Sequence, residues 1–576
     1  MYDLIIRNGR IVDGTGRKAW VGDIGIDGDI IIEAGRDIGG TAHREIDAEG
    51  ALVTPGFVDV HTHYDAQATW DPELTPSGWH GVTTVVMGNC GVGFAPAAPD
   101  RRQWLIELME GVEDIPGAAL ADGIDWAWES FPEYLDALEG HKWVADVGTQ
   151  VPHGPIRAYV MGDRCADGNE ATFEDLTEMK RLVEEGLRAG ALGFSTSRTP
   201  FHKSVHGELV PGTNADINEV LGMGDAIAAA GHGVFQCALH HPYVTDDFSW
   251  MRQIANVTKN PVAFNFNISD LAPDLWPKVL SELDRANTQG HQVVGQVAGR
   301  PVGVLQCWDG TVNPFLRRPS YEALTDLARH ERLAKLAEPD TRARILAEEP
   351  VEISSLMKSI CGNFDRMWIF AGESDYEPDP AESIAAIAAR TGADPQAIAY
   401  DQLNTSEGEG LLYFPFLNYA AGNLDPLLAM HQHQHTRMGL ADAGAHCGTI
   451  CDGGMPTFML AFWTRDRTRG EKLPLEHVVR RQTYGTAKFY GLHDRGRIMS
   501  GQRADINIID YDNLTFDSPR MAWDLPSGAP RFVQKASGYL ATICRGQVTV
   551  ENDEFTGAYP GRLIRGRQTY RGVINR

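Results

Sequence analysis

Short apolar segments and helical segments alternate along the middle of the chain, and this alternation constrains the fold more than any other feature. Eight apolar segments that end in polar or glycine-rich turns are candidate strands: residues 56–63, 81–91, 143–154, 191–198, 233–241, 261–269, 291–301 and 437–446. Residues 173–190, between two of them, have the period of an amphipathic helix. Alternating strands and helices indicate a parallel sheet, so we expect an α/β fold with a (β/α)8 TIM-like barrel over residues 55–480.

Both ends of the chain contain short apolar runs separated by turn signals. The candidate strands are residues 2–6, 10–12 and 23–26 near the start, and residues 504–512 and 539–553 near the end. Asn-Gly and Asp-Gly pairs follow each early run, and Arg545-Gly546 interrupts the last one. Such pairs predict tight turns between strands. We therefore expect a small β-sandwich domain built from residues 1–54 and 481–576.

A long insertion, residues 310–430, separates the last two candidate strands of the barrel. Within it, residues 321–349 are strongly helical in pattern. An insertion on the loop side of a barrel could cover an active site. The alternative is a helical addition without a role in catalysis, and the sequence leaves both open.

Composition excludes several classes of protein. With 51 Lys plus Arg against 78 Asp plus Glu, the net charge of −27 would repel a phosphate backbone, so we expect no nucleic-acid partner. The eight cysteines have no disulfide-framework spacing, which favours reduced thiols and a cytoplasmic location. The first residues lack the pattern of a secretory signal, and no apolar window reaches the ~20 residues that span a bilayer, so we expect no membrane association.

A His-x-His pair closes the first candidate barrel strand. In a strand, side chains two residues apart point to the same face, so His61 and His63 are expected to lie side by side. The carboxyl ends of barrel strands are where active sites form. Two imidazoles at this position can chelate one metal ion.

Several motifs of the chain resemble one enzyme family. TPGFVDVHTHYD (54–65) resembles the first-strand signature of the amidohydrolase superfamily. GVTTVVMGNCG (81–91), GALGFSTSR (190–198), LADAGAH (440–446) and GTAKFYGLHDRGRIMSGQRADINIID (485–510) are similar to the N-acyl-D-amino-acid deacylase (D-aminoacylase) family. The resemblance extends over most of the chain and supports the count of eight strands, whereas the long insertion matches only the longer members.

The resemblance implies a metal site and a mechanism. It makes His61, His63, Cys90 and Asp442 ligands of Zn²⁺. It also makes Asp442 the catalytic general base and acid, which takes a proton from water and passes it to the leaving nitrogen. The expected reaction is hydrolysis of a linear amide bond in a small-molecule substrate.

The chain departs from the family pattern where a second metal ion would bind. The family places a histidine at the end of the fifth and sixth strands, but here Ala238 and an Asn or Phe occupy those positions. His240 and His241 come slightly late, although a shifted loop could still bring one of them to the metal. We therefore favour one zinc ion and leave a second open. Residues 191–198 contain no lysine, which counts against hydantoinase-like relatives with a carbamylated lysine.

Five further residues are candidates for contact with substrate: His153, Ser195, Arg198, Arg300 and His446. His153 ends the third strand and could polarise a carbonyl, or it could be structural. Either arginine could grip a substrate carboxylate in a bidentate fork. His446 could orient the substrate or have a local packing role.

The substrate implied by the resemblance is an N-acyl D-amino acid, a related amide or a small peptide. One alternative is another hydrolysis in the same superfamily, on a lactone, a carbamate or a deaminase substrate. A second alternative, motivated by the missing histidines, is a metal-free relic that binds a ligand. The sequence leaves a homo-oligomer open and does not fix the acyl group, the side chain or the stereochemistry of the substrate.

Overall fold

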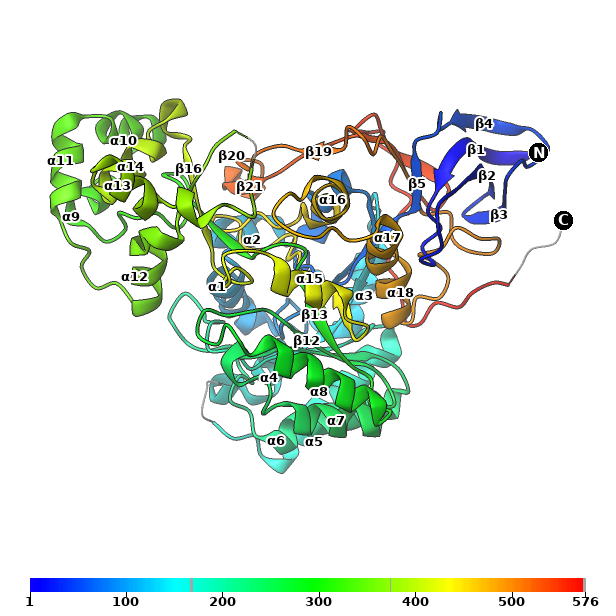
Figure 1. Cartoon of the computed structure of the whole chain (residues 1–576). Coiled ribbons are helices and arrows are strands. Elements are labelled where there is room, and N and C mark those ends of the chain that lie inside the picture. Colours follow the sequence, from blue (N-terminus) through cyan, green and yellow to red (C-terminus); the bar gives the residue numbers. More distant parts are fainter. Residues whose placement is uncertain (166–168, 373, 573–576) are drawn as a thin grey trace.

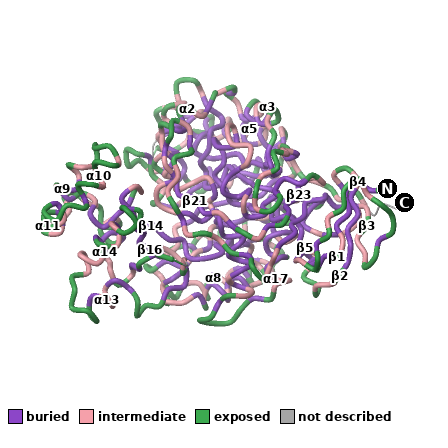
Figure 2. The backbone as a smooth tube through the Cα atoms, turned by 90° about the horizontal axis from the view of Figure 1, so that it is seen from above, coloured by how far each residue is buried: buried purple, intermediate pink, exposed green. Residues whose placement is uncertain are grey.

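The computed structural model describes residues 1–165, 169–372 and 374–572. Figure 1 shows a central body with the helices of residues 319–403 on one side and the strands of residues 2–55 on the other. The buried backbone is concentrated in the central body, as Figure 2 shows. In the described residues, no helix combines the length and the apolar character needed to cross a membrane.

Two parallel sheets form the centre of the molecule. One sheet contains β6 (Phe57–Asp59), β7 (Val82–Met87) and β8 (Asp146–Thr149). The other runs in the order β9-β10-β11-β12-β13-β17, with β9 (Val151–Pro152), β10 (Gly193–Ser197), β11 (Val234–Ala238), β12 (Val262–Asn265), β13 (Val293–Val297) and β17 (Thr436–Met438). Each of the eight segments expected to form strands overlaps one, except residues 143–154, which contain both β8 and β9. A parallel bridge between Thr62 and Ala443 joins the chain after β6 to the chain after β17.

Helices pack against these strands, and the sequence defines where several of the helices begin and end. The helix α5 (Phe173–Ala189) begins with a capping box between Thr172 and Asp175 and ends at Gly190, as expected from residues 173–190. The next helix, α6 (Ile217–Ala230), is capped by Asp216 and ends at Gly231 in the left-handed conformation. Both helices bury an apolar face against the strands.

The two ends of the chain share one mixed sheet. Its strands are β1 (Tyr2–Ile11), β2 (Trp20–Asp27), β3 (Ile30–Gly35), β4 (Ala42–Asp47), β5 (Leu52–Pro55), β18 (Ile506–Ile509), β23 (Tyr539–Cys544), β24 (Gln547–Glu551) and β25 (Glu554–Phe555). The halves meet where β5 pairs antiparallel with β18. Apolar side chains from both ends, such as Ile6, Ile24, Ile508 and Ile543, pack in one core.

One predicted turn in this sheet is wrong. The pair Asn8-Gly9 does not separate two strands but lies inside β1, where the register shifts between Ile6 and Gly9. Asn8 takes the left-handed conformation (φ 55°), which occurs in some β-bulges as well as in tight turns. The turns at Asp27-Gly28 and Arg545-Gly546 connect neighbouring antiparallel strands as expected.

The insertion has a hydrophobic core of its own, which includes Phe315, Tyr321, Ile345 and Tyr400. Its expected helix over residues 321–349 is instead divided among three helices: α9 (Pro319–Glu322), α10 (Arg329–Leu336) and α11 (Pro339–Ala347). Proline fits the first turn of a helix but not its interior, so Pro339 starts a new helix.

Candidate metal centre

Four polar side chains meet at the carboxyl ends of three parallel strands. His61 and His63 follow β6, Cys90 follows β7, and Asp442 follows β17. The two histidines and the cysteine are almost completely buried. Because parallel strands end at the same edge, residues far apart in sequence converge here.

The distances between these groups suit one metal ion. The Nε2 atom of His61 lies 3.3 Å from Cys90 Sγ and 3.3 Å from Asp442 Oδ1. His63 Nε2 lies 3.7 Å from the same oxygen. Ligand atoms of His61, His63 and Cys90 all lie within 4.8 Å of one another. Tetrahedral zinc, with bonds of ~2.0 Å to nitrogen and ~2.3 Å to sulfur, separates its ligand atoms by about 3.3–3.8 Å.

The loop that carries Cys90 has an unusual backbone. Cys90 has a positive φ of 56°, and Gly88 and Gly91 on either side have φ of 74°. Ser195, a predicted substrate contact, holds this loop instead: its hydroxyl donates to Gly88 O at 2.5 Å and accepts from Gly91 N at 2.9 Å. Strained backbone of this kind persists only where surrounding contacts hold it, and it is concentrated at functional sites.

The loop that carries Asp442 is strained in the same way. Asp442 has a φ of 46° and His446 a φ of 54°. Backbone hydrogen bonds tie this loop to the end of β6: Asp442 N donates to His61 O at 3.1 Å, and His63 N donates to Ala443 O at 2.8 Å. The carboxylate is therefore fixed relative to both imidazoles.

Two residues that the sequence analysis missed orient the imidazoles. Gln296 Oε1 accepts a 2.7 Å hydrogen bond from His61 Nδ1, so the other ring nitrogen, Nε2, faces Cys90 and Asp442. Glu113 Oε1 lies 3.3 Å from His63 Nδ1. Partners of this kind fix the ring orientation and tautomer of metal-binding histidines. Gln296 could have been found from the sequence, because it is a polar residue inside an apolar candidate strand. Glu113 ends helix α1 (Arg102–Glu113), and nothing in the sequence marks it as a functional residue.

The charges at this cluster fit a cation. Burial alone would raise the pKa of Asp442, but the nearby His61 and His63 outweigh it and lower the pKa. Burial raises and His61 lowers the pKa of the Cys90 thiol, with a net decrease. The anionic forms of Asp442 and Cys90 are thus favoured beside the two imidazoles, and Asp442 Oδ1 has no hydrogen-bond partner in the described residues. Nitrogen, thiolate and carboxylate ligands together are a set that zinc accepts.

Neutral amides occupy β11 and β12, where the family resemblance implied additional histidines. Gln236 Oε1 accepts a 2.9 Å hydrogen bond from Cys90 N, and Gln236 Nε2 donates to Asn265 Oδ1 at 2.9 Å. Asn265 Nδ2 in turn lies 3.7 Å from Cys90 Sγ. Ala238 is buried at the end of β11, in register with Ser197. These strands therefore offer hydrogen bonds to the Cys90 loop rather than imidazole ligands.

Comparison with known proteins places this arrangement in a family. The model of the Amidohydrolase family matches residues 44–550, which contain all four residues of the cluster. The chain belongs to the amidohydrolase family. This amidohydrolase is 34% identical over 573 residues to a D-aminoacylase of Alcaligenes xylosoxydans xylosoxydans, covering 98% of the chain and 97% of that relative. It is 26% identical to an N-acyl-D-glutamate deacylase of the same organism, covering 91% of the chain and 90% of that relative.

Solved structures show the same fold. A D-aminoacylase structure aligns with this amidohydrolase at a TM-score of 0.64 and 22% identity, covering 98% of the chain and 100% of that protein. An N-acyl-D-glutamate deacylase of Bordetella bronchiseptica, complexed with zinc and a phosphonate inhibitor, aligns at a TM-score of 0.64 and 23% identity, covering 98% and 99%.

Other predicted substrate contacts of this amidohydrolase have different surroundings. His153 is buried between Thr196 Oγ1 (2.9 Å from Nδ1) and Glu219 Oε1 (3.0 Å from Nε2). Arg300 is completely buried, 3.1 Å from Asp452 Oδ1 and with its guanidinium 3.8 Å from the centre of the Tyr376 ring. Buried and already paired in this way, Arg300 is not placed to grip a substrate carboxylate.

Three further candidates, Arg198, His240 and His241, make contacts outside the cluster of His61, His63 and Cys90. Arg198 is partly exposed and donates to Ala215 O at 3.1 Å. His240 stacks on Tyr243, with ring centres 5.2 Å apart. His241 follows it in a short 3-10 helix, and the structure brings neither histidine into the cluster of His61, His63 and Cys90.

His446 lies at the exposed side of the cluster. Its Nε2 atom is 3.7 Å from Glu113 Oε2, and 24% of its side chain is exposed. Glu113 therefore bridges His63 and His446, which places His446 where it could meet an entering substrate.

Proposed function

We propose that this chain hydrolyses the amide bond of an N-acyl D-amino acid or a related small amide. The observation that carries the proposal is the convergence of His61, His63, Cys90 and Asp442 at the ends of three parallel strands. The D-aminoacylase and N-acyl-D-glutamate deacylase relatives, matched over nearly their whole lengths, support the substrate class.

His61, His63, Cys90 and Asp442 would hold a divalent cation, for which zinc is the best fit. When bound, such a cation supplies a Lewis acid for the scissile carbonyl and acidifies water. Asp442 lies where it can accept the proton of the attacking water and return it to the leaving amine. Its lowered pKa keeps it ionised near neutral pH, which is the form that can accept a proton. Gln296 and Glu113 keep the two imidazoles in fixed orientations during this transfer.

We further propose a single metal ion in each chain. Ala238 and the hydrogen-bonded pair Gln236 and Asn265 offer no imidazole for a second position. Elemental analysis of the purified protein should find about one equivalent of zinc per chain. Two equivalents would contradict the single-ion proposal without affecting the reaction class.

The decisive test compares N-acyl D-amino acids, N-acyl L-amino acids, lactones, carbamates and aminopyrimidines as substrates, with zinc supplied. We expect release of a free amine from an N-acyl D-amino acid. If deamination or ester cleavage were the only reaction found, the proposed substrate class would be wrong. Protein without stoichiometric metal and without activity would support the ligand-binding relic instead.

The first prediction concerns the proton-transfer group. Asp442→Asn preserves shape but removes the base, so kcat should fall on the order of 10²–10⁴-fold. Asp163→Asn, at an exposed carboxylate, is the matched control and should leave kcat unchanged. Zinc content and circular dichroism are measured on both variants. Full activity of Asp442→Asn would rule out the assigned role.

We also infer the finer architecture. The two parallel sheets, linked by the bridge between Thr62 and Ala443, are consistent with one closed (β/α)8 barrel over residues 55–480. For residues 1–54 and 481–576 we propose a small β-sandwich domain, which the mixed sheet and the core shared by both ends support. Because all eight cysteines are free thiols, we propose a reducing, cytoplasmic location.

A further inference from the structure

A second polar hollow lies at the opposite ends of the parallel strands from the metal centre. Its lining includes residues that begin strands or directly precede them: Pro261 before β12, Gln292 before β13, and Thr436 at the start of β17. The metal ligands instead follow the strand ends. The hollow has a volume of about 530 Å³, within the range of small-molecule sites.

Four cationic side chains line this space, and we call it the basic hollow: Arg437, Arg480, Arg481 and Lys488. Among its described lining residues there is no Asp or Glu. At its rim, the lining residue His433 has its Nε2 3.3 Å from Asp284 Oδ1. In a chain of net charge −27, a hollow whose lining contains four Lys or Arg side chains and no Asp or Glu is unexpected as a solvated surface.

Arg481 gives an independent sign of a missing partner. Arg481 is buried, with only 6% of its surface exposed. Its Nε has no hydrogen-bond partner in the described part of the chain. Among the described residues, its other nitrogens reach only Thr436, with Nη1 3.3 Å from the carbonyl oxygen and Nη2 3.2 Å from Oγ1. Burial first, and then the like charge of Arg437, lower the pKa of Arg481 to about 9. A buried cation normally has a carboxylate or a bound anion beside it.

Arg437 is similarly uncompensated. Its Nη1 donates to Gln434 O at 2.9 Å and Thr436 O at 2.7 Å, and its Nε has no partner among the described residues. Burial and the charge of Arg480 lower the pKa of Arg437. The ion pairs found in the described chain include none for Arg437, Arg480 or Arg481, so three guanidinium groups are held together against their mutual repulsion.

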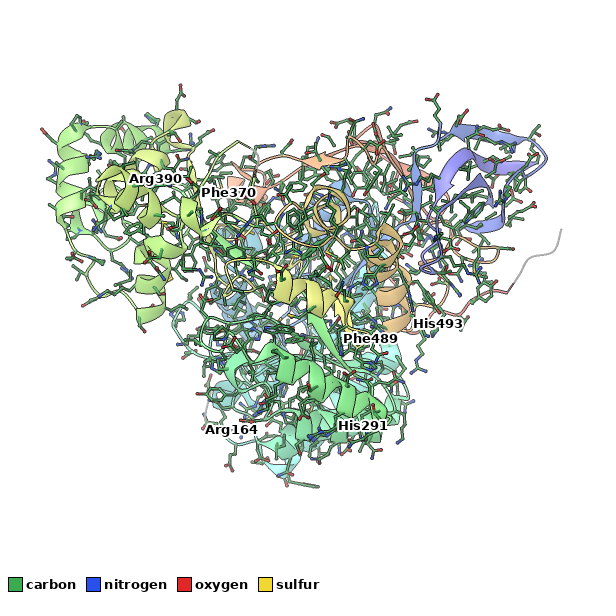
Figure 3. All side chains as sticks on the ribbon, viewed as in Figure 1. Arg164, His291, Phe370, Arg390, Phe489 and His493 are labelled. Atoms are coloured by element: carbon green, nitrogen blue, oxygen red, sulfur yellow. The ribbon has the colours of Figure 1, made fainter. Side chains whose placement is uncertain are left out.

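A smaller hollow of about 280 Å³ adjoins the first and is also basic. It shares Lys488 and Phe489 with the basic hollow and adds Lys259 and Arg567. Figure 3 labels Phe489 and His493, which mark this side of the molecule near α18 (Tyr484–Phe489). The two hollows together therefore form a basic surface that is larger than one small anion needs.

We propose that the basic hollow binds a small anion with two or more phosphate groups, such as a diphosphate ester. Guanidinium groups match phosphate oxygens in bidentate geometry, and several of them suit a multiply charged ligand better than one carboxylate. The adjoining hollow gives room for the rest of such a ligand. This site is separate from the proposed hydrolase centre, and its occupant is not the amide substrate.

The test measures binding of inorganic pyrophosphate to the full-length protein by calorimetry and by the shift of Tm, at low salt. Wild type should bind, and a nucleoside diphosphate should bind at least as well if the second hollow is used. Arg437→Gln should weaken binding about tenfold or more, because it removes a charge-assisted contact. Arg390→Gln, at an exposed arginine paired with Glu382, is the matched control and should bind like wild type.

A readout besides affinity separates a ligand site from a purely structural cluster. Arg437→Gln relieves repulsion with Arg481, so its Tm without ligand should equal or exceed that of wild type, while the pyrophosphate-induced shift is lost. A large drop in its unliganded Tm would contradict the proposal. So would the absence of pyrophosphate binding to wild type, equal binding of citrate, or binding of only RNA or anionic vesicles.

Discussion

At the scale of single residues, His61 shows how the site is prepared for a metal ion. Both ring nitrogens are used: Nδ1 donates to Gln296, and Nε2 faces Cys90 and Asp442. Burial alone would lower the pKa of His61, but Cys90 and Asp442 outweigh it and raise the pKa to about 9. A cation would replace the proton that these anionic neighbours otherwise favour.

The contact with Gln296 leads to the second prediction. Gln296→Leu removes the acceptor for His61 Nδ1, so metal affinity should fall about 10–100-fold. Gln296→Glu keeps an acceptor and should retain most of the affinity. Competition with a chelator measures the metal affinity of both variants. Equal metal affinities of Gln296→Leu and Gln296→Glu would show that Gln296 does not act through His61.

Asp494 leads to the third prediction, on acid stability. Burial would raise the pKa of Asp494, but Arg495 and Arg503 outweigh it and hold the pKa below its usual value. A carboxyl whose folded pKa is lowered stabilises the fold above its unfolded pKa of about 3.9, and this contribution is lost as the pH falls below that value. Free energies of unfolding measured from pH 6 to pH 3 should therefore decrease less steeply for Asp494→Asn than for wild type. Asp163→Asn should follow the wild-type slope.

At the scale of elements, the loops after the strands decide whether the ligands meet. Strand β7 ends at Met87, and the turn through Gly88 and Gly91 then directs Cys90 toward His61. A side chain on Gly91 would place its Cβ 2.9 Å from the backbone nitrogen of Ser197 at the end of β10. The loop thus depends on a glycine for both its conformation and its close packing.

Gly91 gives the fourth prediction. Gly91→Ala should lower the free energy of unfolding by about 1–3 kcal/mol and weaken metal binding, because the Cys90 loop must move. Gly207→Ala is the matched control, since Gly207 also has a positive φ (81°) but open space around its missing Cβ. It should cost only about 1 kcal/mol and leave metal binding unchanged. Thermal unfolding and chelator competition distinguish the two.

The strands and the ligands that follow them could be predicted because their signals are local. Each candidate strand is an apolar run, and the position of His61 and His63 after such a run follows from alternation. Contacts between distant segments could not be predicted, as the roles of Glu113 and Ser195 show. Single-residue signals were also ambiguous: Asn8-Gly9 fits a turn or a bulge, and Arg300 fits a substrate contact or a buried ion pair.

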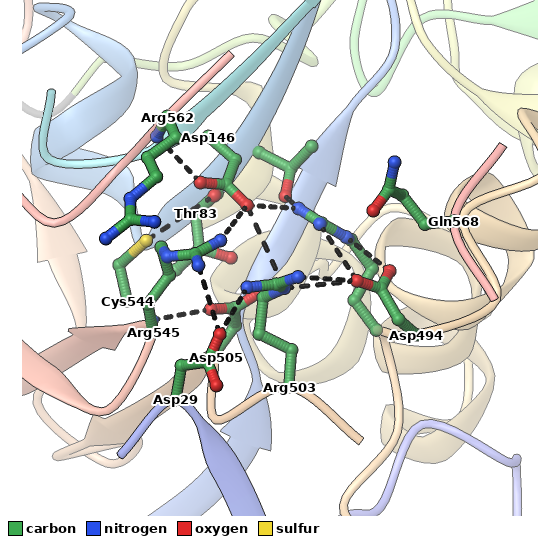
Figure 4. A network of polar contacts seen from close by, with 12 residues as sticks. Asp29, Thr83, Asp146, Asp494, Arg503, Asp505, Cys544, Arg545, Arg562 and Gln568 are labelled. Atoms are coloured by element: carbon green, nitrogen blue, oxygen red, sulfur yellow. Dashed lines mark hydrogen bonds and ion pairs between the residues drawn. The ribbon is translucent and has the colours of Figure 1, made fainter. Parts of the chain in front are cut away.

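At the scale of the whole molecule, a buried ionic network joins the parallel strands to the mixed sheet (Figure 4). Asp146 in β8 accepts from Arg495 at 2.9 Å and lies 3.5 Å from Arg545, at the turn between β23 and β24. Arg545 also donates to Asp29, at the turn between β2 and β3. One carboxylate thus connects segments from both ends of the chain to the centre.

This network gives the fifth prediction. Asp146→Ala leaves Arg495 buried without this partner, so the free energy of unfolding should fall by about 3–5 kcal/mol. Urea unfolding measures the loss, and the exposed Asp163→Ala should change it by less than about 0.5 kcal/mol. A similar loss in both variants would mean that the network does not stabilise the interface.

The pairing of β5 with β18 has a consequence for how the protein is made. About 450 residues separate Pro55 from Ile506, so at 5–20 residues per second a ribosome needs roughly 20–90 s to deliver the second strand after the first. During that interval the edge of β5 that will receive β18 has no partner and is open to other chains. A nascent chain that stops anywhere before residue 506 keeps this edge, which makes premature termination products a source of aggregation.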